Sequence, residues 1–493
     1  MGKKRMLAAD FGASSGRVMA GDYDGKRLEV RTLHRFSNDP VWLFDTMHWD
    51  FLRLFHELKE GIRKAGPSGA DSIGVDTWGV DFGLLDREGR LLENPVHYRD
   101  ARTAGMLEKA FEKLDKDRFY EITGNQFMEI NTAFQLLALK EQNPAALERA
   151  DRLLLMPDLF DYYLSGVAAS EYTIASTTQL MDAARRDWSG EVMCALGIPQ
   201  RIFPQIVAPG TVLGPLCSSV CRELSMEPFS VVATAGHDTQ CALAAVPSGQ
   251  DDFIFVSCGT WSLFGTELPE PVIHADSARY NVTNEGAYGG RISFLKNIIG
   301  LWLIQESRRQ WIREGREYDF GTLETMAAEE KENKSFVDPD DPVFVPAGDI
   351  PARIRAYCEK TGQAIPDTPA RIVRCIDESL ALKYRIAMEE ICACTKKSYS
   401  CIHLVGGGAN SRLLCQLVAD ICGIPVHAGP VEATACGNLA IQLAAAGEVN
   451  GLSQMREVIA ASEEICIYEP RAHESWEETY QHFKTEIVGK GKM

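Results

Sequence analysis

CIHLVGGGANSRLLCQLVADICGIPVHAG, residues 401–429, carries the clearest structural pattern in the chain. A short apolar run ends in glycines, apolar residues then recur at helical spacing, and a second apolar run follows. We expect Asn410 to cap the helix and these residues to face inward: Leu413, Leu414, Leu417, Val418 and Ile421. A strand, glycine turn, helix and strand in this order predicts an α/β domain.

Two other glycine turns of related form lie further from this stretch, DFGASSG at 10–16 and SCGTW at 257–261. The first belongs to a predicted antiparallel meander near the N-terminus, which is followed by a helix over 50–65 and two short strands. The second lies in a predicted hairpin after the turn cluster at 247–252. We therefore expect mixed sheets flanked by helices, in two domains at 1–247 and 248–493. The charged, proline-rich residues 314–370 suit a surface excursion or lid.

Composition narrows the class of protein. A length of 493 residues, 45% hydrophobic and 24% charged, indicates a globular chain of two to four domains. No apolar stretch is long enough to cross a bilayer and the N-terminus does not resemble a signal peptide, so we expect a cytoplasmic protein. The cysteines lack the paired spacing of a zinc site. A net charge of −18 disfavours nucleic acid and membrane partners, and leaves the oligomeric state open.

The segment TAGHDTQCALAAVP, residues 234–247, places an acid among small residues. Asp238 could accept a proton from a substrate hydroxyl in an interdomain cleft. The alternative is that Asp238 caps the start of a helix.

The turn after Asp10 could direct several backbone N–H groups at a phosphate, because its glycine and serine side chains are small. Asp10 would then hold magnesium through water, and Arg17 could steady the turn or the nucleotide. The alternative is an ordinary hairpin with Asp10 as turn former. Gly259 and Thr260 could hold the nucleotide from the second domain.

The glycines of VGGGAN, residues 405–410, would let a base or ribose lie against bare backbone. A packing turn is the alternative, above all for Gly408. Neither G-x-G-x-x-G nor G-x-x-x-x-G-K-[ST] occurs in the chain. The pattern that remains is the two-turn scheme of the actin-like ATPase fold, which indicates phosphoryl transfer.

Several segments, in order along residues 6–470, resemble the FGGY carbohydrate kinase family: AADFGASSGRVM, GVDTWGVDFGLLD, YRDART, AGHDT, SCGTWSL and VGGGANSRLLCQLVADICGIPVHAGPVEATACGN. The resemblance implies two ribonuclease H-like domains of the actin-like ATPase fold, separated by a cleft. It also implies that the first domain mainly holds the sugar and the second mainly holds ATP and Mg²⁺.

The resemblance also assigns residue roles. It implies Asp238 as the base, and sugar contacts from His237, Thr239, Asn297 and the backbone of Gly79. It implies nucleotide contacts from Ala13, Ser14, Ser15, Gly16, Arg17, Thr260, Gln305 and the turn Gly406, Gly407 and Gly408. We expect residues 294–306 to form one helix that carries both Asn297 and Gln305, with a packing helix as the alternative.

The implied reaction is the ATP-dependent phosphorylation of L-rhamnulose. L-fuculose or a similar ketose is the alternative substrate, and a non-catalytic sugar or nucleotide sensor is the alternative function. The base segment reads AGHDT rather than the GGxD-like form that resembles xylulose kinases, which argues against pentulose substrates. An aromatic wall of Trp42, His48, Trp49 and Trp78 could stack on the sugar, although such residues are more often core.

Overall fold

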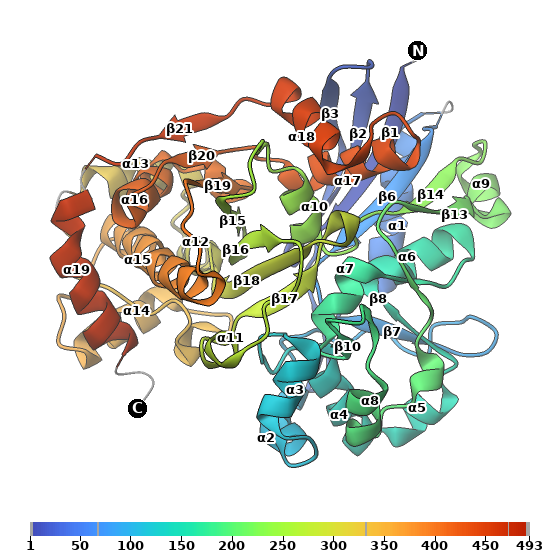
Figure 1. Cartoon of the computed structure of the whole chain (residues 1–493), viewed down its shortest axis with the longest axis horizontal. Coiled ribbons are helices and arrows are strands. Elements are labelled where there is room, and N and C mark those ends of the chain that lie inside the picture. The colour runs from blue at the N-terminus through green and yellow to red at the C-terminus, as the bar shows by residue number, and fades with distance from the viewer. Residues whose placement is uncertain (1–2, 67–68, 331–332, 472, 490–493) are drawn as a thin grey trace. The chain divides into compact units, whose positions relative to one another are not determined.

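The computed structural model describes residues 3–66, 69–330, 333–471 and 473–489 (Figure 1). Contacts divide the chain into two compact units. The first contains the residues up to Gly249 with Glu267–Phe294 and Ala433–Glu463. The second contains Gln250–Thr266, Leu295–Glu432 and the residues from Glu464. The units are thus interleaved in sequence, whereas the expected boundary divides the chain once, between residues 247 and 248.

The first unit is built on a six-stranded mixed sheet of order β13-β14-β6-β1-β2-β3. Its strands are β1 Lys4–Phe11, β2 Ser15–Tyr23, β3 Leu28–Ser37, β6 Ser72–Thr77, β13 Thr211–Pro215 and β14 Ser230–Ala233. The predicted antiparallel meander is confirmed in β1, β2 and β3, while β6 runs parallel to both β1 and β14. Parallel strands bring their carboxyl ends to one edge, where sites of α/β sheets form.

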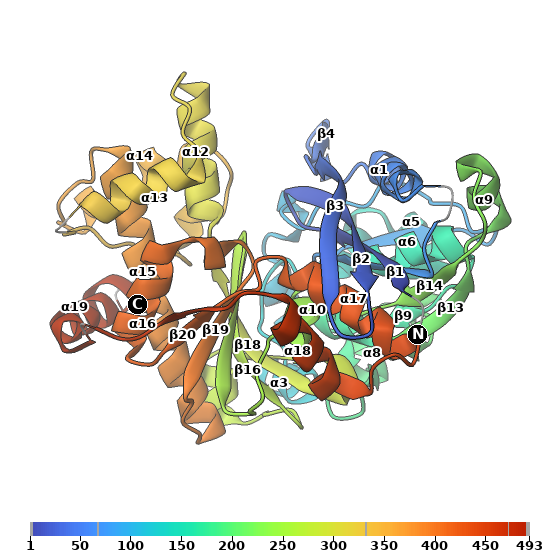
Figure 2. The ribbon, with the colours of Figure 1, turned by 90° about the horizontal axis from the view of Figure 1, so that it is seen from above.

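Helices from both halves of the sequence cover this sheet. The main ones are α1 Phe51–Lys64, α6 Met156–Ser165, α10 Asp238–Ala244, α17 Ala433–Ala445 and α18 Gly451–Ser462. Helix α1 confirms the helix predicted over 50–65. Figures 1 and 2 show α17 and α18 beside β1, β2 and β3. Helix α17 approaches α10 closely, since a Cβ added to Gly437 would lie 1.8 Å from the Cys241 oxygen.

A helical layer and short sheets complete the first unit. The helices are α2 Met106–Phe111, α3 Lys116–Thr123, α4 Thr132–Gln142, α5 Pro144–Arg149, α7 Tyr172–Ala175, α8 Gly190–Leu196, α9 Ser218–Leu224 and α11 Ala275–Arg279. The strands of the short sheets are β4 Val41–Leu43, β5 Thr46–His48, β7 Phe82–Leu85, β8 Arg152–Leu155, β9 Ser170–Glu171, β10 Met181–Asp182, β11 Asp187–Trp188 and β12 Ile206–Val207. Strand β17 Thr283–Gly286 belongs to the second mixed sheet.

A second mixed sheet, of order β17-β18-β16-β15-β19-β20-β21, supports the second unit. Its further strands are β15 Phe253–Cys258, β16 Trp261–Leu268, β18 Ile292–Ile299, β19 Cys401–Val405, β20 Val426–Ala428 and β21 Cys466–Tyr468. The predicted hairpin is confirmed in β15 and β16, and β15, β19 and β20 run parallel.

The helices of the second unit are α12 Trp302–Arg313, α13 Phe320–Glu329, α14 Ile350–Lys360, α15 Pro369–Thr395, α16 Arg412–Cys422 and α19 Glu477–His482. The predicted strand, turn, helix and strand at 401–429 are confirmed, but the prediction of Asn410 as cap was wrong. Ser411 is the N-cap of α16 and accepts a hydrogen bond from Leu414 N, because Asn410 belongs to the preceding turn. Residues 314–370 contain α13 and α14, both with buried apolar side chains.

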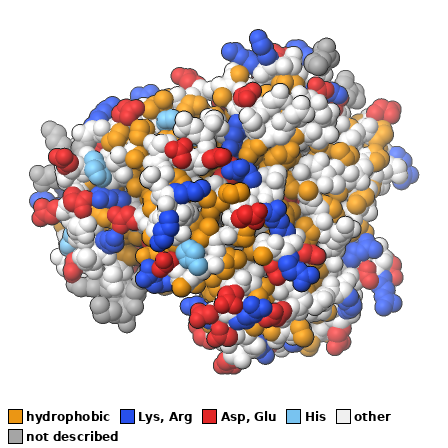
Figure 3. All heavy atoms as spheres, viewed as in Figure 1, with side chains coloured by type: hydrophobic (Ala, Val, Ile, Leu, Met, Phe, Trp, Pro, Cys, Tyr) orange, Lys and Arg blue, Asp and Glu red, His pale blue; other side chains and the backbone are white. Residues whose placement is uncertain are grey.

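The surface carries both signs of charge, and on the face in Figure 3 Lys, Arg, Asp and Glu are interspersed. Across the described residues, none of the helices combines the length and apolar character that a bilayer crossing requires.

Candidate active site

In the first unit, the turn before α10 lies beside the end of β6. Thr77 N donates to Gly236 O at 2.9 Å, and Thr77 pairs with His237 in a parallel bridge. His237 occupies the N-cap position of α10, so Asp238 is the first helical residue rather than the cap. The Asp238 side chain is 29% exposed, which leaves its carboxylate open to a ligand.

A buried glutamate fixes the shape of this turn. One carboxylate oxygen of Glu171 accepts hydrogen bonds from Gly236 N at 2.8 Å and Thr173 N at 2.9 Å. Thr173 in turn accepts from His237 N through its hydroxyl, at 3.2 Å. Gly236 is required, because an added Cβ would lie 2.9 Å from Pro157 Cγ and 3.1 Å from Glu171 Oε2. These contacts hold the two backbone residues that precede Asp238.

Neighbouring charges tune the Asp238 carboxyl. Burial raises the pKa of Asp238 to about 6, His237 opposes this rise, and the charge of Asp10 adds to it. His237 Nε2 lies 3.5 Å from Asp238 Oδ1, and His237 Nδ1 lies 3.1 Å from Glu285 Oε2. Burial alone would lower the pKa of His237, but the charge and hydrogen bond of Glu285 raise it overall. A carboxyl with a pKa near neutrality suits general base catalysis.

Two aspartates at the ends of adjacent parallel strands form the acidic part of the site. Asp10 on β1 pairs in register with Asp76 on β6. Asp76 is fully buried, and its Oδ2 accepts a hydrogen bond from Asn438 Nδ2 at 2.6 Å. Its Oδ1 accepts none from the described residues. Burial, and then the charge of Asp10, raise the pKa of Asp76 well above its usual value.

The β1–β2 turn lies next to Asp10. Asp10 is on the strand rather than in the turn, and Arg17 binds its Oδ2 through Nε at 3.0 Å and through Nη2 at 2.9 Å. Asn38 Nδ2 donates to Gly12 O at 2.9 Å and so braces the turn. Partly exposed residues of the turn are Ala13, Ser14 and Ser15, while Gly16 is buried.

Gly79 lies in a strained turn between β6 and β7. The next residue, Val80, has a φ of 69°, a conformation that β-branched residues rarely adopt. Val80 N donates to Thr177 Oγ1 at 3.2 Å, and Thr132 Oγ1 donates to Val80 O at 2.6 Å. Strain held in place by several contacts is typical of functional sites.

The predicted aromatic wall is only partly assembled. Trp49 and Trp78 are buried with ring centroids 4.0 Å apart, and both donate to Asp81 Oδ2, at 2.6 and 3.0 Å. Trp42, by contrast, is 57% exposed on β4, and His48 is partly exposed on β5. The Asp81 carboxylate therefore positions both indoles through hydrogen bonds.

In the second unit, the structure brings together Thr260 and Gln305. Thr260 Oγ1 donates to Gln305 Oε1 at 3.1 Å, and Leu301 N donates to Gly259 O at 2.9 Å. The start of α12 is thereby fixed on the β15–β16 turn.

The glycine turn after β19 packs on the same hairpin. A Cβ on Gly408 would lie 2.3 Å from Cys258 Sγ, and one on Gly406 would lie 3.1 Å from Cys258 O. Gly406 also has a φ of 81°. Gly407 is less confined, since its added Cβ would be 4.0 Å from Cys258 O. Three segments predicted to hold nucleotide thus meet within one unit.

The expectation of one helix over 294–306 was wrong. Asn297 lies on β18 and Gln305 on α12, with Gly300 between the two elements. A Cβ on Gly300 would lie 2.5 Å from Ser262 Oγ, so glycine is needed where the strand ends against β16.

Sequence reasoning missed three residues of the first unit's site: Asp76, Glu171 and Asn438. Asp76 could have been found, because AADFG and GVDTW both read as strands that end near an aspartate. The contacts of Glu171 and Asn438 join segments far apart in sequence, which local patterns do not reveal.

Known proteins resemble this chain over its whole length. The model of the "FGGY family of carbohydrate kinases, N-terminal domain" matches residues 5–245, and that of the C-terminal domain matches residues 254–446. A protein named rhamnulokinase from Bacteroides thetaiotaomicron is 40% identical over 98% of this chain and 99% of its own length. Another rhamnulokinase, from Oceanobacillus iheyensis, is 40% identical over 94% of this chain and 97% of its own.

Solved structures share the fold. A gluconate kinase from Lactobacillus acidophilus superposes with a TM-score of 0.80 at 15% identity and covers 99% of both chains. A xylulose kinase from the same organism has a TM-score of 0.79 at 16% identity, covering 99% of this chain and 97% of its own. At these identities the likeness concerns the two-domain α/β fold alone.

Proposed function

Because the chain belongs to the FGGY family of carbohydrate kinases, we propose that it transfers the γ-phosphoryl group of ATP to L-rhamnulose, giving L-rhamnulose 1-phosphate and ADP. The relatives named rhamnulokinase, 38–40% identical over nearly the whole chain, support this choice of sugar. L-fuculose or a similar ketose is the second candidate. The structure describes no disulfide among the cysteines that it resolves, which suits a reducing compartment, and we place the reaction in the cytoplasm.

Asp238 is the base in this proposal. Its carboxylate takes the proton of the sugar's primary hydroxyl while that oxygen forms a bond to the γ-phosphorus. The bond from the γ-phosphorus to the bridging oxygen breaks, and ADP leaves with that electron pair. The observation that carries the assignment is a partly exposed carboxyl, with its pKa raised to about 6, next to the strand-end aspartates. A sensor would have no need of such a group.

We propose that the sugar contacts the backbone of Gly79 and the imidazole of His237 in the first unit. We also assign it the side chain of Asn297, which belongs to the second unit. Thr239 is 2% exposed, and its hydroxyl donates to Asp238 Oδ1 at 3.2 Å. We therefore propose that Thr239 orients the base at least as much as it contacts sugar.

Magnesium fits the strand-end aspartates. Mg²⁺ prefers carboxylate oxygens, and the buried Asp76 Oδ1 is an acceptor without a hydrogen-bond donor among the described residues. We propose that Asp10 holds Mg²⁺, through water, with Asp76 supporting it. The ion would neutralise charge on the phosphates when bound. Arg17 then steadies Asp10 or moves to a phosphate.

The nucleotide is assigned to both units. We propose that Ala13, Ser14, Ser15, Gly16 and Arg17 surround the phosphates, and that Thr260, Gln305, Gly406 and Gly407 hold the rest of ATP. The base and the phosphate turn belong to the first unit, and the other nucleotide residues belong to the second. Turnover therefore requires that residues of both units bind the same ATP molecule.

The base role is tested with Asp238→Asn. A positioned general base contributes roughly 10²–10⁴ in rate, so the variant should lose most of its turnover but still bind ATP. Asp276→Asn is the matched control, because Asp276 also lies in the first turn of a helix of the first unit. Retention of more than about a tenth of wild-type turnover in Asp238→Asn would assign the proton transfer to another group.

A further inference from the structure

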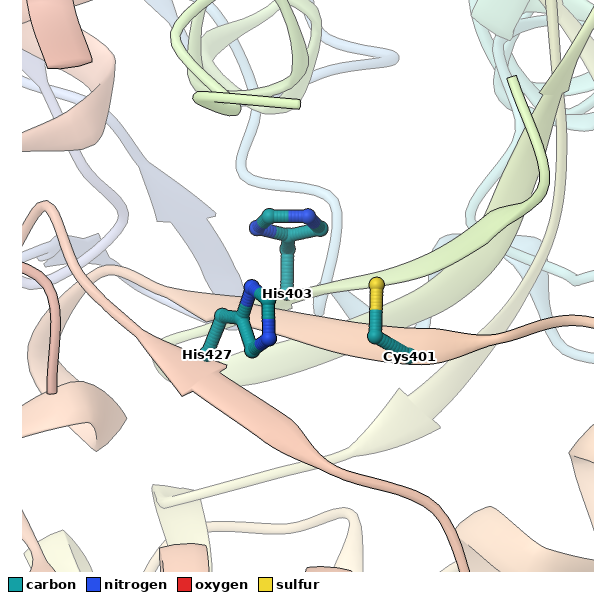
Figure 4. Close-up of side chains that lie close together, drawn as sticks. All are labelled: Cys401, His403 and His427. Atoms are coloured by element: carbon teal, nitrogen blue, oxygen red, sulfur yellow. The ribbon is translucent and has the colours of Figure 1, made fainter. Parts of the chain in front are cut away.

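Three side chains with metal-binding atoms meet on the sheet of the second unit: Cys401, His403 and His427. One ligand atom from each lies within 4.8 Å of the others. Figure 4 shows the two imidazoles and the thiol on the same side of strands β19 and β20. The proposed phosphoryl transfer uses none of them.

The strand geometry accounts for this meeting. Alternate residues of a strand face the same way, so Cys401 and His403 share one face of β19. His427 is the register partner of His403 on the parallel strand β20. The two imidazole centroids are 4.9 Å apart with their planes at 80°. All three backbone positions are therefore fixed by strand pairing within a sheet rather than by loops.

The donor set is selective. A thiolate with two imidazoles suits zinc or copper and discriminates against Mg²⁺ and Ca²⁺, which prefer oxygen. Tetrahedral Zn²⁺, with bonds of about 2.0–2.3 Å, needs its ligand atoms roughly 3.3–3.6 Å apart. The distances between the three ligand atoms must therefore shorten when the ion binds. Rotation of the Cys401 and His427 side chains can shorten them, because both are partly exposed, whereas His403 is buried. Partial exposure also gives a metal a route in and a place for water as fourth ligand.

We propose that Cys401, His403 and His427 bind one Zn²⁺ ion, with water completing a tetrahedral site. The ion joins β19 to β20. Strand β19 leads directly into the glycine turn at 406–408, so the site braces the strand that carries the proposed nucleotide turn. Spacings between cysteines do not reveal this site, because two of its three ligands are histidines.

Cobalt is the spectroscopic probe for this site. Co²⁺ is titrated into the full chain, reduced with a phosphine, without ATP, sugar or Mg²⁺. We expect saturation at one equivalent for the sulfur site, with a thiolate-to-cobalt charge-transfer band and intense tetrahedral d–d bands. Zn²⁺ should displace Co²⁺ and abolish both. Cobalt at the Asp10 carboxylate would give no thiolate band, so the two sites are distinguishable.

Single substitutions then identify the ligands. Cys401→Ser should abolish the charge-transfer band, and His427→Gln should weaken cobalt binding by about tenfold or more, since even outer-sphere changes at metal sites cost 10–100-fold. Cys194→Ser, which removes an exposed thiol from α8, is the matched control and should bind as wild type does. Zn²⁺ should raise the melting temperature of wild type and Cys194→Ser but not of Cys401→Ser.

Two results would overturn the proposal. One is a cobalt-saturated wild type without a thiolate band. The other is an unchanged band in Cys401→Ser, which would mean that another thiol binds the ion. Melting of each apo variant checks that a lost band does not reflect a lost fold, and Cys401→Ser, a near-isosteric change, keeps the test valid if His427→Gln folds poorly.

Discussion

At Asp238, two neighbours act on one proton in opposite directions. His237 lowers the pKa of the carboxyl, and Asp10 raises it, while burial is the largest influence. The base must be ionised to work, so kcat/KM should fall as the pH drops through about 6. That acid limb reports the environment of a single residue.

Replacing His237 tests this balance. His237→Gln removes the cation that favours the ionised carboxyl, so the pKa of Asp238 should rise and the acid limb should move to higher pH. His274→Gln, at a helix N-cap of the same unit, is the control and should leave the limb in place. A limb that stays fixed or moves to lower pH in His237→Gln would contradict the assignment.

Asp76 links stability to function. Its pKa in the folded state is raised by burial, so the protonated carboxyl stabilises the fold at low pH and that stability is lost as the pH rises. Asp76→Asn cannot ionise and should keep the acceptor for Asn438. Its melting temperature relative to wild type should therefore increase between about pH 5 and about pH 8, while magnesium-dependent turnover falls.

Asp276→Asn again supplies the comparison, and its melting difference should not vary with pH in this way. An Asp76→Asn difference that is the same at both pH values would mean that Asp76 is ionised throughout. The sequence could have suggested Asp76, but its unusual pKa depends on burial and on Asp10 across the strand pair. Neither the burial of Asp76 nor its position beside Asp10 can be read from the local sequence pattern.

At the scale of elements, the glycine turn on β19 can be tested by a matched pair. A methyl at Gly408 would meet Cys258 Sγ at 2.3 Å, whereas one at Gly407 has no neighbour closer than 4.0 Å. Gly408→Ala should destabilise the protein by about 1–3 kcal/mol through overpacking and should raise the KM for ATP. Gly407→Ala should melt as wild type does.

Any rise in KM for Gly407→Ala then reports contact with the nucleotide itself. Equal melting of the two variants would show that the turn is not held against Cys258.

Elements with a strong local period were predictable. The helix α1, the β15–β16 hairpin and the 401–429 unit follow their apolar spacing, and the structure confirms them. The structure of residues 294–306 was not predictable in this way, because the apolar run of β18 is as compatible with a buried strand as with a helix. The tertiary contact of Gly300 with β16 ends the strand there, which separates Asn297 from Gln305.

At the scale of the whole molecule, the fold class and the family were readable from motifs in order, but the assembly of the first unit was not. Helix α17 lies near the C-terminal end of the sequence but packs against α10 and β1. Its Asn438 Nδ2 donates to Asp76 Oδ2 at 2.6 Å. Its Gln442 Nε2 donates to Leu7 O at 2.8 Å. Gly437 permits this approach. Such long-range packing depends on the complete fold.

The central claim, phosphorylation of L-rhamnulose, is tested by ADP release from the purified full chain with ATP and Mg²⁺. The acceptors are L-rhamnulose, L-fuculose, D-xylulose and glycerol, each supplied in turn. We expect the highest kcat/KM with L-rhamnulose, L-rhamnulose 1-phosphate as the product, and almost no ADP release by Asp238→Asn. Equal or faster turnover of any of the other three acceptors would contradict the substrate, and the absence of sugar-dependent release with all four would contradict the proposed kinase activity.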